Sequence, residues 1–191
     1  MMTKYTATVT ATVLDLQYYK LQAQTEFYKP LDQNNKFTLK LRGSLGYADD
    51  YGSENFPFFR NFYMGGVRTV RGYRTSSIGP KYYNSSAGRW YTTGGTKSVL
   101  ASAELFFPVP GLKKSDSFRL STFFDAGGVF SDDESIDGTE QYEQGDMRYS
   151  VGLGLQWNSP FGPLQVSIAE PLNDDSKDRL QRFQFGMGST F

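Results

Sequence analysis

The sequence predicts an all-β chain: an antiparallel up-and-down transmembrane β-barrel with about eight strands in its 191 residues. Apolar and polar residues alternate through segments of about 10 residues, the length that a tilted strand needs to cross a bilayer. Short turns and long polar connections separate these segments, as in outer-membrane barrels. Aromatic residues make up 16% of the chain, yet no apolar run approaches the roughly 18 residues of a membrane helix.

The predicted strands show two-faced alternation from the first to the last. The first reads "YTATVTATV", the sixth "MRYSVGLGLQW" and the last "RFQFGMGSTF". Side chains alternate sides along a strand, so each segment presents one apolar and one polar face. The eight segments lie at about 4–14, 17–29, 36–48, 97–108, 117–130, 146–158, 162–171 and 181–191.

Alternation alone does not separate a membrane barrel from a soluble β-sandwich, because the strands of a sandwich alternate as well. The turns "PLDQNN" and "NSPFGP" are short, whereas "SDDESIDGTEQYEQGD" and the region of about 49–96 are long. Aromatic residues gather near the segment ends, as the interface girdles of a barrel require. Charged side chains occupy the polar face, which a barrel would turn into its lumen. These features favour the membrane barrel and leave the sandwich as the alternative.

Composition argues against several classes of function. Twenty basic and 20 acidic residues give zero net charge, which disfavours nucleic-acid binding. The chain has no cysteine and no histidine, so thiolate, zinc-cysteine and histidine chemistry are absent. Glu104 and Asp125 could form an acid–base pair, but no nucleophile or phosphate-binding loop accompanies them. We therefore expect neither an enzyme nor a cofactor or metal site. The first residues also lack the form of a signal peptide.

The segment "GGVRTVRGYRTSSIGP", residues 65–80, places Arg68, Arg71 and Arg74 among glycines. A helix would stack the three charges on one face, where they would repel one another. The glycines make that helix improbable. The sequence therefore predicts an irregular loop that carries three permanent charges.

Five stretches, taken in order, resemble a known family. They are "TVRGYRTSSIGP", "ASAELFFPVP", "FFDAGGVF", "LQWNSPFGPLQVSIAEP" and the terminal "FQFGMGSTF". Together they are similar to the C-terminal half of the barrel in the BamA family, the core subunits of the outer-membrane β-barrel assembly machinery. The resemblance covers roughly residues 16–191, and the VRGY motif with its flanking "IGP" is highly specific.

The resemblance implies a location in the bacterial outer membrane, contact with its lipid, and the folding and insertion of β-barrel clients beside assembly-machinery lipoproteins. Family members carry periplasmic POTRA domains before a 16-stranded barrel with a lateral gate between its first and last strands. This chain matches only half of that barrel, so we expect it to be inactive as an insertase by itself. A passive membrane barrel is one alternative. A fragment of a two-partner-secretion transporter, which shares the VRGY-type loop, is another.

The resemblance also implies the roles of particular residues. The motif Val70, Arg71, Gly72 and Tyr73 would form the tip of a loop folded into the lumen. Alternation independently places Glu104 and Asp125 on the inward faces of adjacent strands, as partners for Arg71. Arginine suits this pairing because its planar fork can bind a carboxylate through two bonds. Three solvated loop charges are the alternative.

The last strand, about 181–191, is expected to carry a C-terminal recognition signal formed by Phe183, Phe185, Met187 and Phe191. A plain membrane strand that ends in an interface aromatic is the simpler reading, and the two are compatible. The inward glycines, Gly152, Gly154, Gly186 and Gly188, either relieve crowding in a narrow barrel or admit a kink and a close backbone approach.

Closure of the sheet leaves two arrangements, because open edges in lipid strand unpaired backbone groups. The first and last strands could pair within one chain, or two chains could join edge to edge as a homodimer of about sixteen strands. We expect the closed monomer. Its lumen could hardly admit a loop of about 48 residues. We therefore expect the loop to lie outside a closed eight-stranded monomer, and Arg71 to meet its carboxylates in a wider barrel.

Overall fold

The computed structural model describes residues 2–12, 18–34, 36–50, 58–111, 117–131, 142–160 and 162–188. One curved antiparallel sheet holds eight strands in the order β1-β2-β3-β7-β8-β10-β11-β13. Their bounds are Met2–Thr12 for β1, Tyr18–Pro30 for β2, Thr38–Asp50 for β3, Lys97–Pro108 for β7, Phe118–Phe130 for β8, Arg148–Ser159 for β10, Gly162–Pro171 for β11 and Phe183–Met187 for β13. The all-β prediction and its eight strands are confirmed.

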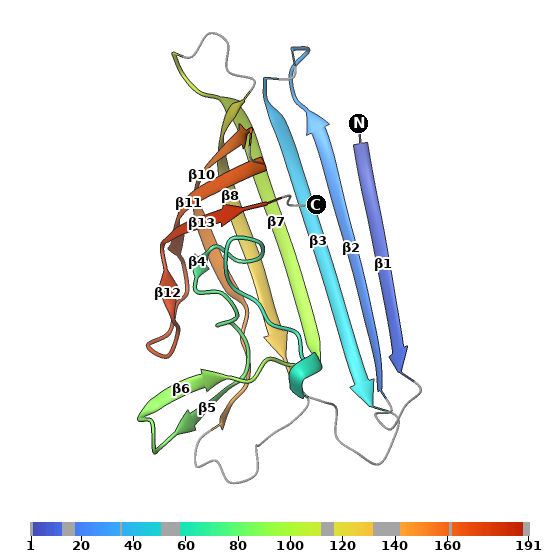
Figure 1. Ribbon diagram of the computed structural model, residues 1–191, viewed down its shortest axis with the longest axis vertical. Coiled ribbons are helices and arrows are strands. Elements are labelled where there is room, and N and C mark those ends of the chain that lie inside the picture. The colour runs from blue at the N-terminus through green and yellow to red at the C-terminus, as the bar shows by residue number, and fades with distance from the viewer. Residues whose placement is uncertain are drawn as a thin grey trace.

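The smaller elements lie in the long connections. A 3-10 helix, η1, spans Phe58–Arg60. One small sheet pairs β4 (Gly72–Tyr73) with β12 (Leu180–Gln181), and another joins β5 (Lys81–Asn84) to β6 (Arg89–Thr92) and β9 (Tyr142–Glu143). The long connections gather at one end of the sheet, the lower end in Figure 1, and the short turns at the other. The described residues contain no helix long and apolar enough to cross a membrane.

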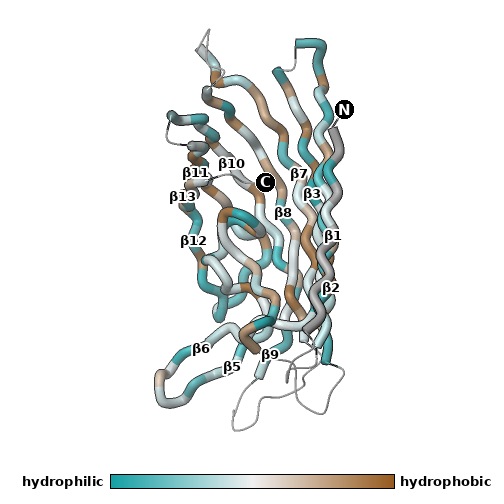
Figure 2. Tube along the Cα trace, turned by 45° about the vertical axis from the view of Figure 1, so that its right-hand side comes forward, coloured by the Kyte–Doolittle hydropathy of each residue, from teal (hydrophilic) through white to brown (hydrophobic). Residues whose placement is uncertain are grey.

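Hydrophilic and hydrophobic residues follow one another along the strands (Figure 2), and the exposure of their side chains distinguishes two faces. Outward side chains such as Leu45, Leu153 and Ile168 are about three-fifths exposed. On the concave face, Ser121 and Ser150 are buried. The outside of the sheet is therefore an apolar surface suited to lipid, and the polar side chains point inward.

The predicted last strand begins too early. Leu180 and Gln181 belong to β12 and pair with β4, while β13 begins only at Phe183 and pairs with β11. Between the two strands, the carbonyl of Arg182 accepts a hydrogen bond from the amide of Ala169. The chain thus leaves the loop sheet and joins the main sheet within three residues. Phe191 lies outside the described residues.

The expected closed eight-stranded barrel is wrong. Among the described residues, β1 pairs with β2 and β13 pairs with β11, but β1 and β13 do not pair with each other. An eight-stranded lumen is just filled by its own side chains. Here the concave face also accommodates the segment around residues 62–78, so the sheet is open and the loop lies against it.

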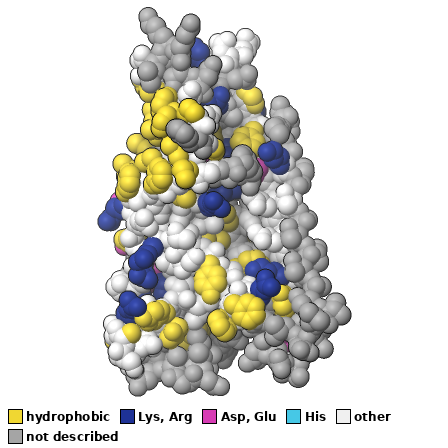
Figure 3. Space-filling model, viewed as in Figure 1, with side chains coloured by type: hydrophobic (Ala, Val, Ile, Leu, Met, Phe, Trp, Pro, Cys, Tyr) yellow, Lys and Arg dark blue, Asp and Glu magenta, His cyan; other side chains and the backbone are white. Residues whose placement is uncertain are grey.

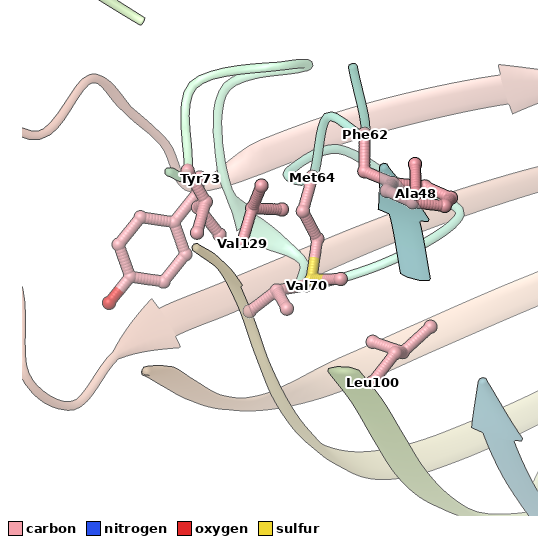
Figure 4. Packing of buried hydrophobic residues seen from close by; sticks show 8 residues of the cluster. Ala48, Phe62, Met64, Val70, Tyr73, Leu100 and Val129 are labelled. Atoms are coloured by element: carbon pink, nitrogen blue, oxygen red, sulfur yellow. The ribbon is translucent and has the colours of Figure 1, made fainter. Parts of the chain in front are cut away.

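The hydrophobic core lies between this loop and the sheet (Figure 4). Its members are buried residues from the two sides: Phe62, Met64, Val70, Tyr73 and Ile78 from the loop, and Ala48, Leu100 and Val129 from the strands. A Cβ on Gly127 of β8 would come within 2.4 Å of Met64 Sδ and 2.9 Å of Val70 Cγ2. Glycine at this position therefore lets the loop approach the sheet.

Candidate functional site

The arginine-bearing segment 65–80 is an irregular loop because its glycines adopt backbone angles that other residues avoid. The φ angles are 106° at Gly65, 98° at Gly66, 91° at Gly72 and 137° at Gly79. In this region of φ an L side chain is strained. A Cβ on Gly65 would also lie 2.3 Å from the carbonyl oxygen of Arg74. Glycine thus permits the two arms of the loop to pack together.

Arg71 reaches from this loop to the carboxylate of Asp125 on β8. Its Nε donates to Asp125 Oδ2 at 2.7 Å, and its Nη2 donates to Oδ1 at 2.9 Å. The backbone amide of Arg71 donates to Oδ2 as well, at 3.2 Å. The two side chains are 3% and 0% exposed. This is a buried bidentate pair, the strong form of an arginine–carboxylate contact.

Glu104 on β7 binds Nη1, the third nitrogen of the same guanidinium. Arg71 Nη1 donates to Glu104 Oε1 at 3.0 Å, and the guanidinium lies 3.3 Å from the centroid of the Phe123 ring. The hydroxyls of Ser121 and Ser102 donate to Glu104 and Asp125 at 2.7 and 2.6 Å. The network therefore has one cation, two carboxylates and two neutral donors.

The charges of this network depend on one another. Burial alone would lower the pKa of Arg71, but hydrogen bonds to Asp125 and the charges of Asp125 and Glu104 raise it above its ordinary value. A buried charge that loses its partner costs several kcal/mol. Arg71 is therefore the counter-charge that lets Asp125 and Glu104 remain on the concave face.

Strand register explains how the two carboxylates meet one arginine. Asp125 lies opposite Ser102, and Glu104 lies opposite Phe123. Positions two apart on a strand share a face, so Glu104, Ser102, Phe123 and Asp125 all point to the concave side. Sequence reasoning placed the carboxylates there but missed Ser102, Ser121 and Phe123. The same alternation could have found them once β7 and β8 were paired.

The rest of the VRGY motif attaches the loop to the last strands. Val70 is fully buried, and Gly72 and Tyr73 pair as β4 with β12. The carbonyl of Tyr73 accepts a hydrogen bond of 2.7 Å from Gln184 Nε2 on β13. Burial, with the charge of Asp178, raises the pKa of Tyr73 to about 12, so its phenol stays protonated. The motif thus contacts the lumen carboxylates on one side and the last strand on the other.

The other two arginines of the loop behave differently. Arg68 and Arg74 are exposed, and neither side chain has a hydrogen bond or ion pair within the described ranges. For Arg68 and Arg74, the hypothesis that the loop charges are solvated fits the structure. Arg71 alone of the three is buried.

Phe183, Phe185 and Met187 on β13 project outward and are 60%, 58% and 66% exposed. Of the inward glycines, Gly186 faces the loop, since a Cβ there would lie 3.1 Å from Val67 Cγ1. A Cβ on Gly152 would lie 2.5 Å from Phe123 Cζ, under the ring that carries Arg71. For Gly152 and Gly186, the structure favours the hypothesis that glycine permits a close approach of neighbouring groups. A Cβ on Gly188 would have no neighbour within 4 Å.

Gly72→Ala should loosen the loop. Its φ of 91° strains any side chain, at roughly 1–3 kcal/mol. The new Cβ would also lie 3.2 Å from Ala169 Cβ and 3.3 Å from Pro171 Cγ. We expect faster tryptic cleavage at Arg68 and Arg74. Gly88→Ala is the control, because its φ is also positive but no atom lies within 4 Å. Equal cleavage of the two variants would contradict a close fit at Gly72.

Comparison with known proteins places this arrangement in a family. The Omp85 superfamily domain matches residues 1–191. The chain belongs to the Omp85 superfamily. It is 40% identical over 195 residues to the outer membrane protein assembly factor BamA of Neisseria meningitidis, covering 92% of this chain and 24% of that protein. It is 28% identical to a SAM50-like protein of Schizosaccharomyces pombe, over 84% of this chain and 33% of that one.

A solved structure supports the same Omp85 fold. The crystal structure of BamA from Haemophilus ducreyi lacking POTRA domains 1–3 matches with a TM-score of 0.82 at 30% identity. The match covers 96% of this chain and 37% of that one. The chain therefore spans between 24% and 37% of the length of these relatives.

Proposed function

We propose that this chain is the C-terminal barrel portion of an outer-membrane assembly factor, which folds and inserts β-barrel proteins in bacteria. Its 40% identity to an assembly factor over 92% of its length supports this role. The observation that carries the proposal is the position of the VRGY loop. The loop is bonded to Asp125 and Glu104 and also to Gln184 of the last strand.

In this proposal the loop holds the last strand in place while the strand's other edge receives a client. Within the described ranges, β13 pairs on one side alone, with β11. A free strand edge presents unpaired backbone groups that another strand can join. The outward residues Phe183, Phe185 and Met187 would keep that edge in the lipid, and together with Phe191 they form the proposed recognition signal. No covalent catalysis is required.

The free edges of β1 and β13 also need strands to cover them in lipid, where each unpaired backbone group costs several kcal/mol. We propose that further strands of a longer protein complete the barrel, because the relatives are three to four times as long as the matched region. A homodimer joined edge to edge is the alternative. Assembly-machinery lipoproteins are proposed partners of the complete protein.

The test is client folding in liposomes. A urea-unfolded outer-membrane barrel is diluted into vesicles that contain the complete protein, the 191-residue chain or no protein, and folding is followed by heat-modifiable mobility on gels. We expect acceleration by the complete protein, its loss in the Arg71→Ala variant, and none from the 191-residue chain. Ion conductance without acceleration would instead indicate a transporter.

A further inference from the structure

A hollow of about 400 Å³ lies at the short-turn end of the concave face. Three cations line it: Lys4 of β1, Lys40 of β3 and Arg119 of β8. The amide side chains of Gln156 and Gln165 also line it. No Asp or Glu does so within the described part of the chain. This turn-end hollow therefore has a positive lining, and of its three cations Lys40 has an ion pair with Glu26 next to the hollow.

Arg42 adds a fourth cation next to this hollow. Its Nε is buried and has no hydrogen-bond partner among the described residues. Together with Arg71 and Glu104 it lines a smaller cavity of about 20 Å³. This cavity shares Lys40, Gln156 and Gln165 with the turn-end hollow. The two spaces therefore adjoin. The smaller one has room for about one water-sized group, such as a carboxylate oxygen.

The nearest carboxylates are already engaged. Glu26 lies opposite Arg42 in the sheet register, but its Oε1 lies 3.2 Å from Lys40 Nζ, and its Oε2 accepts a hydrogen bond from Tyr28. Glu104 is bound by Arg71 and Ser121. In the view of Figure 3, Lys and Arg are spread over the coloured surface, whereas Asp and Glu are almost absent from it. A buried donor without an acceptor is costly, so a ligand that accepts a hydrogen bond from Arg42 Nε would offset that cost.

We propose that the turn-end hollow binds the carboxylate of an acidic peptide segment from another polypeptide, with Arg42 as its anchor. The guanidinium fork and the nearby ammonium of Lys40 match a carboxylate. Gln156 and Gln165 can donate to and accept from a peptide backbone, whereas phosphate would use mainly their amide donors. A hollow of this size falls within the roughly 300–1,000 Å³ of pockets that hold small ligands. The proposal concerns binding and does not depend on the insertase activity.

The test measures binding to the 191-residue chain in detergent micelles. The probe is a fluorescein-labelled peptide of alternating aspartate and valine, followed by fluorescence anisotropy at low salt. We expect Arg42→Gln to weaken binding at least tenfold and Lys40→Gln to weaken it less, because Lys40 is partly neutralised by Glu26. The control, Arg89→Gln, removes a cation from the hairpin at the opposite end and should change nothing. Equal affinity of wild type and Arg42→Gln would overturn the proposal.

Stability provides a second readout. In the absence of peptide, Arg42→Met should raise the thermal midpoint, because it removes a half-buried side chain whose Nε lacks a hydrogen-bond partner and keeps the apolar stem. The peptide should then raise the midpoint of the wild type and not of the variant. A destabilised Arg42→Met that still binds the peptide would show that Arg42 is structural.

Two further measurements test whether the ligand is a carboxylate and whether it comes from another polypeptide. Inorganic phosphate that displaces the peptide at equal concentration would overturn the peptide proposal in favour of a general anion site. Loss of peptide binding in the complete protein would show that carboxylates of its own additional strands fill the hollow, which would overturn binding to another polypeptide.

Discussion

Replacing Arg71 with alanine should destabilise the folded chain by about 3–5 kcal/mol, the range for removing one partner of a buried ion pair. The substitution leaves Asp125, 0% exposed, and Glu104, 6% exposed, facing each other without the guanidinium. It also removes the cation from the Phe123 ring. The loop would then lose its side-chain hydrogen bonds to β7 and β8 and would keep only the amide bond to Asp125 and the apolar packing. Unfolding by guanidinium chloride in detergent measures the loss of stability, and proteolysis of the 65–80 loop measures how far the loop is loosened.

Two further variants test whether the effect of Arg71→Ala comes from the buried network. Arg71→Lys keeps the charge but cannot form the bidentate pair with Asp125 and the bond to Glu104 at once, so it should recover only part of the stability. Arg68→Ala removes a charge from the same loop at an exposed position, and its effect should stay within about 0.5 kcal/mol. Similar losses in Arg68→Ala and Arg71→Ala would mean that the network has no special importance.

Sequence patterns sufficed for the strands because each strand has two different environments. Leu153 faces outward and Gly154 inward, and this difference repeats along β10. Alternation also put Glu104 and Asp125 on the inner face before any pairing was known. The start of the last strand was harder to place, because Leu180 and Gln181 directly precede β13 in sequence but pair with β4. Local periodicity does not specify which partner a strand selects.

Closure could not be predicted from the strands alone, because it depends on what occupies the lumen. The core of Met64, Val70 and Tyr73 forms only when the loop meets Leu100 and Val129, which are distant in sequence. Glycines give a faint sequence signal of this contact. Gly127 and Gly186 sit on the inner face where the loop approaches, and a side chain at either position would meet it. Their role becomes visible only when the loop is in place.

The loop between β11 and β12 should be as important for the VRGY segment as the lumen carboxylates. Asp178 in this loop is 1% exposed. It forms ion pairs with Lys81 at the start of β5 and with Arg148 at the start of β10, the latter at 2.7 Å. Its Oδ2 also accepts the amide of Asp175 at 2.8 Å. One carboxylate thus joins three connections at the long-loop end of the sheet.

Asp178 is connected to the VRGY segment through the backbone of its neighbours. The amide of Arg74 donates to the carbonyl of Arg179 at 2.7 Å, immediately after Asp178. Asn173, in the same loop, accepts the amide of Tyr149 and the phenol of Tyr73. A loosened Asp178 would therefore release the pairing of β4 with β12 without touching Arg71.

We expect Asp178→Asn to cost about 3 kcal/mol, because it keeps the shape but leaves Lys81, 7% exposed, without its carboxylate. Arg148, 12% exposed, would keep only its 3.9 Å ion pair with the exposed Asp146. Hydrogen exchange at the amides of Tyr73 and Arg74 should accelerate. Glu170→Gln is the matched control. It breaks an ion pair with Arg182 close to the same loop, but those side chains are 60% and 56% exposed, so the loss should be much smaller than that of Asp178→Asn. If the Asp178 loop and the lumen carboxylates hold the VRGY segment together, the losses of stability in Asp178→Asn and Arg71→Ala should be less than additive. The reason is that Asp178→Asn already frees the segment that Arg71→Ala releases. Full additivity, with unchanged exchange at Arg74 in Asp178→Asn, would show that the two attachments act independently.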